Sequence, residues 1–473
     1  MSERGKLKKN VYIIALGQII RIILSFLLVP VAARLLGHDG FGKYSLAMAI
    51  MYIVFMLHDA GVNTYLTREV ARKHERADFY FVNALYFKLI SFGIIIIPLF
   101  LFAYFSKYSD DTKVMILILG LYGVFNSLTQ LCQSIFRAFE KMQYETIIVI
   151  GEKLLITIGG VSILVAGYGL LYFGSVFTFA GLISFVFAVI FLRLKFIPIN
   201  SKFDSKFVKK LFKDSLPFGI SMFLVTIYDK IDIVMLSVMT DMSTVGWYST
   251  AYRLLAITSV IPVILVTSIF PRMSRKALEN RDEVSEIFTR SFKYLFFLAI
   301  PFVSLGMLLG DEIILLVFGS QYQNSVAAFK VLVWAAAILF LNILIGALFR
   351  ASDNQKKLLA IQLGGVFVNF TLNLILIPTH SYIGAAIATV ITEGLIFGVC
   401  FIFILRRVCK LDNLYFIFQG IIAVAIMTVV IGYMQNINLF INMVIAGFVY
   451  FGILYALKAF TLQEILLMRQ KRA

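Results

Sequence analysis

The apolar stretch VYIIALGQIIRIILSFLLVPVAARLL, residues 11–36, decides the class of fold. At 1.5 Å per residue, a helix of this length crosses a hydrocarbon core of about 30 Å. Arg21 lies in its middle, and a guanidinium near the bilayer centre costs roughly 2.5–3.5 kcal/mol on insertion scales. Gln18, Arg21 and Ser25 recur at helical spacing and share one polar face. The stretch therefore predicts a transmembrane helix whose polar face points away from lipid.

Composition extends this prediction to the whole chain. Hydrophobic residues make up 60% of it, charged residues only 15%, and the mean hydropathy is +0.92, which excludes a soluble globular protein. The first apolar stretch is too long for a signal peptide and no cleavage site follows it, so we expect it to be retained. The three cysteines and four histidines are scattered without metal-type or redox-type spacing, so we expect no metal centre and no cofactor.

Apolar runs of similar length follow one another to the end of the chain and predict an all-α, polytopic membrane protein with about 14 transmembrane helices. The predicted spans are 11–36, 41–66, 81–105, 114–136, 146–166, 170–192, 215–238, 247–270, 291–317, 326–349, 358–377, 383–405, 414–434 and 439–460.

The net charge of +17 reflects topology and does not indicate nucleic-acid binding. Most Lys and Arg residues fall in segments on the side of the N-terminus, whereas the opposite loops hold only Lys107 and Lys113. By the positive-inside rule, both termini are predicted to be cytoplasmic.

The longest inner connection, 193–214, interleaves lysines with phenylalanines. Two interpretations stay open: a short amphipathic helix on the anionic inner leaflet, or a linker whose lysines only set topology. The outer loops are too short for a catalytic domain, and no phosphate-binding loop, nucleophile elbow or paired-histidine helix occurs. We therefore predict a transporter and no enzyme.

The chain repeats itself. Gly42-Lys-Tyr-Ser-Leu-Ala47 matches Gly246-Trp-Tyr-Ser-Thr-Ala251, and Phe136-Arg137-Ala138 matches Phe349-Arg350-Ala351. A repeat of six spans gives two lobes related by a pseudo-two-fold axis along the membrane normal, with a substrate site expected between them. The predicted domains are an N-lobe at 1–192 with spans 1–6, a cytoplasmic basic linker at 193–214, a C-lobe at 215–405 with spans 7–12, and spans 13 and 14 with a cytoplasmic tail at 406–473.

Basic residues inside the spans are candidate substrate ligands: Arg21, Arg253, Lys88 and Lys153. Several fixed cations with few matched anions suit a diphosphate, because guanidinium groups bind phosphate oxygens in bidentate fashion. Two alternatives stay open. Lys88 and Lys153 could extend to the cytoplasmic face, and Arg21 could pair with a carboxylate on another helix.

Acidic residues inside the spans are candidates for ion or proton coupling: Glu393, Asp229, Asp232 and Asp59. Glu393 is isolated and deep, and Asp229 and Asp232 share a helix face, so either site could carry a proton. The coupling ion would be H⁺ or Na⁺. The polar stripe Asn126, Thr129, Gln130 and Gln133 on one span is expected to make interhelical hydrogen bonds.

A family resemblance is carried by Val29-Pro-Val-Ala-Ala-Arg-Leu-Leu-Gly37, Gly40-Phe-Gly-Lys-Tyr44 and Asp59-Ala-Gly61. The Phe-Arg-Ala repeats and Gly384-Ala-Ala-Ile-Ala-Thr389, followed by Glu393, add to it. With them the chain resembles the polysaccharide transporter family, the lipid-linked oligosaccharide or O-antigen-type flippases of the multidrug/oligosaccharidyl-lipid/polysaccharide exporter superfamily. The resemblance implies two six-helix lobes, two accessory helices and alternating access around a cationic cavity.

The resemblance also implies a substrate, an undecaprenyl-diphosphate-linked oligosaccharide repeat unit moved to the outer leaflet of the bacterial cytoplasmic membrane for O-antigen, capsule or exopolysaccharide synthesis. In related lipid II flippases, basic residues on spans one, two and eight line the cavity; Arg21 and Arg253 match two of them, and Lys43 is a weaker match. Membrane lipids, a polysaccharide polymerase and a chain-length regulator are the implied partners.

The alternatives are a cation-coupled multidrug or metabolite exporter, or a lipid II flippase, of the same superfamily, and a membrane polysaccharide polymerase or ligase. An exporter is expected to have an acidic, aromatic cavity, and a polymerase or ligase a large outer loop with catalytic charges.

Overall fold

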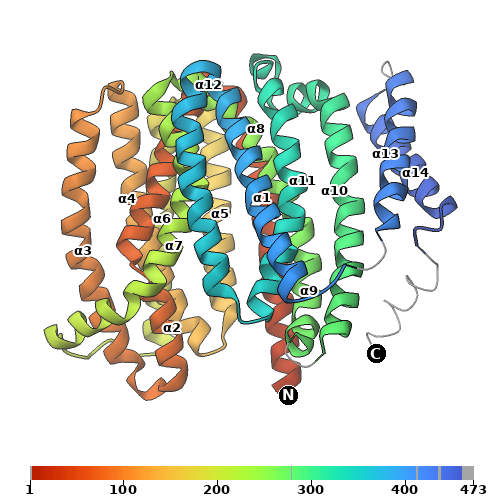
Figure 1. Cartoon of the computed structure of the whole chain (residues 1–473). Helices are drawn as coiled ribbons and strands as arrows, with labels where there is room; N and C mark the ends of the chain where they lie inside the picture. The colour runs from red at the N-terminus through yellow and green to blue at the C-terminus, as the bar shows by residue number, and fades with distance from the viewer. Residues whose placement is uncertain (1–2, 278–279, 412–413, 435–437, 461–473) are drawn as a thin grey trace. The chain divides into compact units, whose positions relative to one another are not determined.

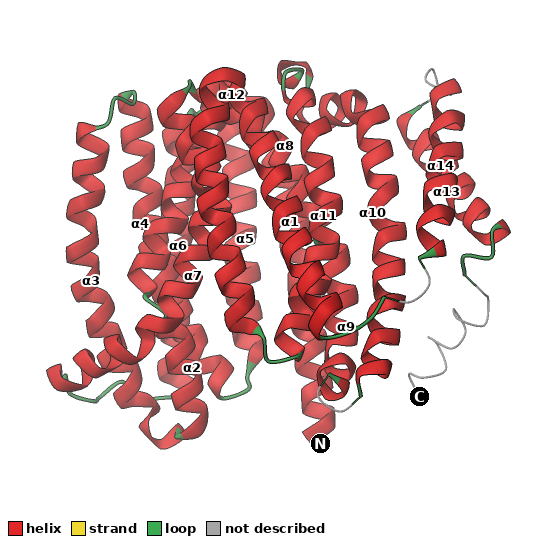
Figure 2. Cartoon of the chain, viewed as in Figure 1, coloured by secondary structure: helices red, strands yellow, loops and turns green. Residues whose placement is uncertain are grey.

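The computed structural model describes residues 3–277, 280–411, 414–434 and 438–460, and all regular structure within them is helical (Figure 2). The all-α prediction is confirmed. The predicted tail at 461–473 lies outside the described residues. The chain divides into two compact units, Met1–Gly246 and Trp247–Ala473.

The described residues of unit 1 form seven α-helices and one short 3₁₀ turn, His74–Arg76 (Figure 1). The helices are α1 (Glu3–Asp59), α2 (Val62–Arg72), α3 (Ala77–Phe105), α4 (Asp110–Ala138), α5 (Met142–Val165), α6 (Leu170–Lys195) and α7 (Ser205–Met239). Helix α4 packs against α1, α3, α5 and α6 and is the most enclosed of the apolar helices. It forms the centre of this unit.

Unit 2 contains the remaining helices, of which α8 begins just before the boundary. They are α8 (Met242–Thr258), α9 (Val260–Lys276), α10 (Arg281–Phe318), α11 (Ser325–Ala351), α12 (Gln355–Arg407), α13 (Tyr415–Tyr433) and α14 (Leu439–Ala456). The predicted span 247–270 is interrupted, because α8 ends at Thr258 and α9 begins at Val260.

Eleven helical segments of the described residues are long and apolar enough to cross a membrane. Two of them, α1 and α12, run on through a residue with non-helical backbone angles, Gly37 and Ser381, and each covers two predicted spans. Helix α7 covers a further predicted span. The fold is therefore that of a polytopic protein consistent with about 14 spans.

Tight turns inside α1 and α12 replace the short loops that the sequence suggests. Gly37 has φ of 70°, a conformation that glycine adopts without steric cost. A few residues later, a Cβ added to Gly42 would lie 1.8 Å from the carbonyl oxygen of Met242, and one added to Gly246 would lie 2.0 Å from that of His38. Gly42 and Gly246, the first residues of the two repeated motifs, therefore both pack directly against backbone and leave no room for a side chain.

The second predicted span, 41–66, extends beyond the C-terminal end of the helix that the structure shows. Helix α1 stops at Asp59, and Ala60 and Gly61 have φ of 46° and 80°. The following residues form α2, a separate helix whose buried residues lie on one face. The amphipathic pattern of 62–72 explains the difference, because such a helix lies across the end of a bundle and does not span it.

The predicted linker 193–214 is mostly helical. Helix α6 runs to Lys195 and α7 begins at Ser205, so only 196–204 is irregular. The amphipathic segment is the first part of α7 and is continuous with the predicted seventh span through Pro217. Helix α7 belongs to unit 1. The predicted domain boundaries stay a prediction.

Candidate substrate-binding cavity

A polar cavity of about 650 Å³ lies within unit 1. Its wall is built by α1, α2, α4 and α5, with Met222 contributed by α7. The polar and charged lining residues are Arg21, Asp59, Asn63, Thr64, Thr67, Arg68, Asn126, Gln130, Gln133, Arg137, Glu152 and Lys153, and the aromatic ones are Tyr52, Phe55 and Tyr122.

Four of the lining residues are basic, and they differ in their partners. The guanidinium of Arg68 donates to Glu69 at 3.0 Å, and that of Arg137 donates to Glu145 at 3.0 Å. Arg21 has an exposed side chain and makes no ion pair or hydrogen bond with another residue of the described ranges. An anion entering the cavity would therefore compete least with protein carboxylates at Arg21.

Amide side chains follow one face of α4 into the cavity. Asn126, Gln130 and Gln133 all line it. The Nε2 of Gln130 donates to Asn126 Oδ1 at 3.1 Å, and Asn126 Nδ2 donates to Glu152 Oε1 at 3.3 Å. The bond from Asn126 to Glu152 joins α4 to α5 as predicted, whereas the bond from Gln130 to Asn126 lies within α4. The row therefore offers both donors and acceptors to a ligand.

Glu152 is the buried end of this row, with 5% of its surface exposed. The hydroxyl of Tyr122 donates to Glu152 Oε1 at 2.7 Å, beside the bond from Asn126. Two donors on one carboxylate oxygen hold the side chain in place. Lys153, the next residue, also lines the cavity.

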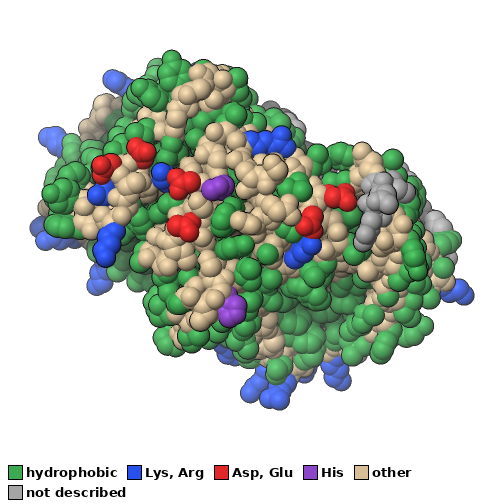
Figure 3. All heavy atoms as spheres, turned by 90° about the horizontal axis from the view of Figure 1, so that it is seen from above, with side chains coloured by type: hydrophobic (Ala, Val, Ile, Leu, Met, Phe, Trp, Pro, Cys, Tyr) green, Lys and Arg blue, Asp and Glu red, His purple; other side chains and the backbone are tan. Residues whose placement is uncertain are grey.

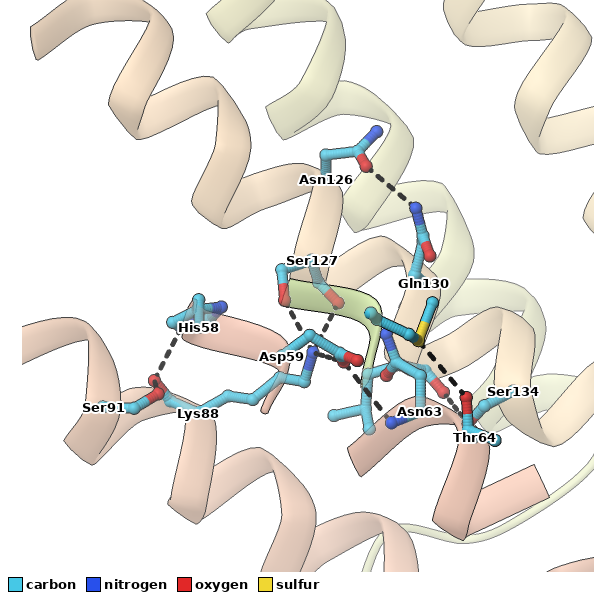
Figure 4. Close-up of polar contacts among 12 residues, drawn as sticks. His58, Asp59, Asn63, Thr64, Lys88, Ser91, Asn126, Ser127, Gln130 and Ser134 are labelled. Carbon is cyan, nitrogen blue, oxygen red and sulfur yellow. Dashed lines mark hydrogen bonds and ion pairs between the residues drawn. The ribbon is translucent and has the colours of Figure 1, made fainter. Parts of the chain in front are cut away.

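Lys88, a predicted substrate ligand, lies outside the cavity wall in this structure. Its ammonium donates to Asp59 Oδ1 at 2.9 Å, to Ser127 Oγ at 2.6 Å and to the Ser127 carbonyl at 3.1 Å (Figure 4). Its side chain is 0% exposed and is not part of the cavity wall. Of the two residues in this ion pair, Asp59 is the one that lines the cavity, and it is 3% exposed. Lys88 acts as the buried counterion of Asp59 and could not contact a ligand without leaving it.

Asn63 lies beside this pair, one turn after Asp59 (Figure 4). Its backbone N–H donates to Asp59 Oδ1 at 3.3 Å, and its side chain lines the cavity. The residue is 5% exposed, and neither atom of its side-chain amide has a hydrogen-bond partner among the described residues. A buried amide without partners costs stability unless a ligand or water satisfies it, so Asn63 is a candidate ligand contact.

The other predicted basic residues lie elsewhere. Lys43 makes an ion pair with Asp39 at 2.9 Å, one turn earlier in α1, and is not among the lining residues. Arg253 is half-buried on α8 in unit 2. Its predicted role as a ligand stays a prediction.

The predicted acidic residues occupy three different settings. Asp229 pairs with the adjacent Lys230 at 2.6 Å and is partly exposed, whereas Asp232, one turn on, is buried. In unit 2, Glu393 on α12 accepts from Asn342 Nδ2 of α11 at 2.7 Å. No group of three or more His, Cys, Asp and Glu side chains within the described ranges is placed to hold a metal ion.

Sequence reasoning did not single out Arg68, Arg137 or Asn63 as lining residues. A signal existed for the two arginines. Arg137 lies in the repeated Phe-Arg-Ala motif, and Arg68 lies at the position of Arg272 when the two repeats are superposed on their first motif. Nothing in the sequence marked Asn63 as a lining residue, because it lay inside the predicted span 41–66 and the turn before α2 was not predicted.

Comparison with known proteins identifies the family. Residues 7–277 match the family model described as polysaccharide biosynthesis protein. The chain belongs to this family. Residues 217–375 also match the MatE family model. Both belong to the multidrug/oligosaccharidyl-lipid/polysaccharide exporter superfamily, so the predicted resemblance is confirmed.

Curated relatives agree with this assignment. The chain is 24% identical over 378 residues to the probable low-salt glycan biosynthesis flippase Agl15 of Haloferax volcanii, covering 78% of this chain and 77% of that protein. It is 22% identical over 403 residues to the capsular polysaccharide biosynthesis protein CapF of Staphylococcus aureus, covering 81% and 96%.

Solved structures share the fold at low identity. The lipid II flippase MurJ in its inward closed conformation superposes with a TM-score of 0.76 at 17% identity, covering 93% of this chain and 97% of that one. An inward-facing multidrug resistance MATE family transporter gives a TM-score of 0.71 at 15% identity, covering 84% and 98%. The predicted fold class is confirmed, and the chain is a multi-pass membrane protein of a transporter superfamily.

Proposed function

We propose that the chain is a flippase for a polyprenyl-diphosphate-linked oligosaccharide, of the undecaprenyl type, in a bacterial cytoplasmic membrane. It would move this lipid from the inner to the outer leaflet by alternating access, for the synthesis of a surface polysaccharide. The observation that carries the proposal is the cavity of unit 1, which combines four basic side chains with a row of amides in a chain of the polysaccharide biosynthesis family.

The two chemical parts of such a substrate match the two parts of the cavity wall. A diphosphate requires fixed cations, and Arg21 offers a guanidinium that no described carboxylate occupies. Sugar hydroxyls both donate and accept hydrogen bonds, as do the amides of Asn63, Asn126, Gln130 and Gln133. The exposed ring of Tyr52 adds an apolar face against which a sugar ring can pack.

Arg253 and the acidic residues complete the proposal. We propose Arg253 as a further phosphate ligand, and H⁺ or Na⁺ as the coupling ion, with Glu393 as the carboxylate that takes it up. Cytoplasmic termini, a polysaccharide polymerase and a chain-length regulator as partners are part of the same proposal.

A multidrug exporter is the second candidate, because the MatE family model also matches the chain. Exported drugs are commonly cationic, and a cavity with Arg21, Arg68, Arg137 and Lys153 would repel them more than the carboxylates of Asp59 and Glu152 attract them. The cavity charge therefore favours the anionic lipid.

The proposal is tested in proteoliposomes that carry a fluorescent undecaprenyl-diphosphate oligosaccharide, with translocation read as protection of the sugar from an impermeant reagent. We expect Arg21→Ala or Arg253→Ala to slow translocation at least about tenfold, because a charged hydrogen-bonded contact contributes about 1.5–3 kcal/mol. Arg21→Lys should be intermediate, since lysine keeps the charge and loses the bidentate geometry.

Arg76→Ala is the matched control, because Arg76 is exposed in unit 1 and does not line the cavity. It should translocate at the rate of the unmodified protein. Unchanged rates in both alanine variants would refute the diphosphate site, and efflux of a cationic dye without any lipid translocation would support the exporter.

A further inference from the structure

The first part of α7 is a basic, partly aromatic helix that is held firmly on unit 1. We define the basic platform as residues 202–216. The side chains of Lys206, Lys209, Lys210 and Lys213 are exposed, and they recur at helical spacing on one face. Leu211 and Ser215 on the opposite face are buried. The predicted amphipathic pattern is therefore present in the helix, with the lysines on its exposed face.

The platform is an ordered structure and not a loose connection. Asp204 caps the helix by accepting from the backbone N–H groups of Lys206 and Phe207. The backbone N–H of Asp204 in turn donates to Asn83 Oδ1 of α3 at 2.7 Å. The Phe207 ring lies edge-on to Tyr80 of α3 at 5.2 Å between centroids. These contacts hold the lysines in one arrangement.

The aromatic side chains of the platform continue the lipid-facing surface of α3. Phe203 packs on Tyr86 with 5.1 Å between centroids, and Phe212 stacks on Phe87 at 5.7 Å. Phe203 and Phe212 are nonetheless 46% and 43% exposed. In Figure 1 this first part of α7 runs across the lower end of α3. The lysines therefore lie where the apolar surface of α3 ends, which is the level of lipid headgroups.

We propose that the basic platform is a binding site for anionic lipid headgroups. Phospholipid phosphates would bind the lysine face, while Phe203, Phe212 and Leu216, all exposed, contact the upper part of the acyl chains. Figure 3 views the structure from above, the end away from the platform, and there Asp and Glu side chains lie among the Lys and Arg side chains. An acidic protein partner would also complement the charge of the lysines. It would not account for the exposed aromatic side chains that extend the apolar surface of α3 onto the platform.

The platform is joined to the cavity wall through close contacts. A Cβ added to Gly61 would lie 2.5 Å from the Ser215 carbonyl oxygen and 2.4 Å from the Gly219 nitrogen. The guanidinium of Arg68, a lining residue, lies 5.3 Å from the centre of the Phe218 ring. Lipid bound to the platform would thus stabilise the start of α2, where Asn63 and Arg68 enter the cavity.

The experiment titrates the purified, full-length protein in non-ionic detergent with phosphatidylglycerol or with phosphatidylcholine, and reads the shift in unfolding temperature. We expect phosphatidylglycerol to protect the protein at a lower concentration than phosphatidylcholine. Replacing Lys206, Lys209, Lys210 and Lys213 by Gln should raise the half-effective phosphatidylglycerol concentration about a hundredfold or more, because each lysine near an anionic surface contributes about fivefold to binding.

A matched control removes the same charge from unit 2, with Lys356, Lys357, Arg406 and Arg407 changed to Gln. These side chains are also exposed, but they lie in two pairs at the two ends of α12 and not on one helix face, so the control should raise the half-effective concentration much less than the platform variant. The protection should also weaken from 0.1 M to 1 M salt, as the Debye length falls from about 10 Å to about 3 Å. If the fourfold platform variant misfolds, the Lys209→Gln/Lys210→Gln variant should still raise the half-effective concentration about 25-fold.

Equal protection by both lipids, or an unchanged phosphatidylglycerol response in the platform variants, would overturn the proposal. The same holds if the platform variants lose surface polysaccharide in cells while their lipid response is unchanged, because that result would assign the lysines to a protein partner.

Discussion

The buried pair of Lys88 and Asp59 allows a quantitative prediction about stability. The two side chains are 0% and 4% exposed, so removing one charge leaves the other without a counterion in a desolvated site. Such a loss costs about 3–5 kcal/mol, whereas replacing both charges by neutral groups is nearly neutral. We therefore expect Lys88→Met and Asp59→Asn each to destabilise the protein by about 3–5 kcal/mol.

The double variant should recover most of this loss. The Asp59→Asn change keeps an oxygen that can accept from the Asn63 N–H, and the Lys88→Met change keeps an apolar chain in the space of the lysine stem. We expect a total cost of about 2 kcal/mol or less in the double variant and a coupling energy of about 3 kcal/mol or more. Reversible unfolding by sodium dodecyl sulfate in mixed micelles measures all four proteins of this cycle.

The control is a Lys–Asp pair of the same chemistry at a more exposed site. Lys330 and Asp311 form an ion pair between α10 and α11, with side chains 32% and 43% exposed. Lys330→Met should cost less than about 1 kcal/mol. Additive effects of Lys88→Met and Asp59→Asn, with a double variant as unstable as their sum, would refute the assignment of Lys88 as the counterion of Asp59.

Two further outcomes follow from the structure. Gly42→Ala should sharply lower the yield of folded protein, because its Cβ would meet the Met242 carbonyl at 1.8 Å, whereas Gly93→Ala, with no atom within 4 Å, should fold normally in the same size-exclusion assay. Glu393→Gln should keep the hydrogen bond from Asn342 but abolish the response of translocation to an imposed H⁺ or Na⁺ gradient; a response equal to that of the unmodified protein would exclude this carboxylate.

The sequence pattern predicted most of the helices and the polar face of α4, because both depend on the spacing of residues along one helix. It could not distinguish Lys88 from Lys153, which lie at similar depths in their predicted spans. The structure separates them, since Lys88 meets Asp59 and Ser127 from other helices while Lys153 faces the cavity. That difference depends on how each helix is rotated against its neighbours.

The end of α1 was missed for a related reason. Ala60 has a left-handed conformation that few non-glycine residues adopt, and its local sequence does not demand a turn. The turn is held by tertiary packing, because Gly219 of α7 fits directly against the Ala60 backbone. Asn63 becomes a lining residue only once this turn is made.

The ammonium of Lys88 lies among oxygens of Asp59 and Ser127 at 2.6–3.1 Å. A metal cation bound at Asp59 would need similar oxygen ligands. A dissolved ion can exchange with the surrounding solution, whereas the Lys88 ammonium is covalently attached to α3. In this structure the Lys88 ammonium fills the position beside Asp59 that a bound cation would otherwise occupy. An ion that bound Asp59 during a transport cycle would first have to displace the Lys88 ammonium, and with it the ion pair that joins the end of α1 to α3.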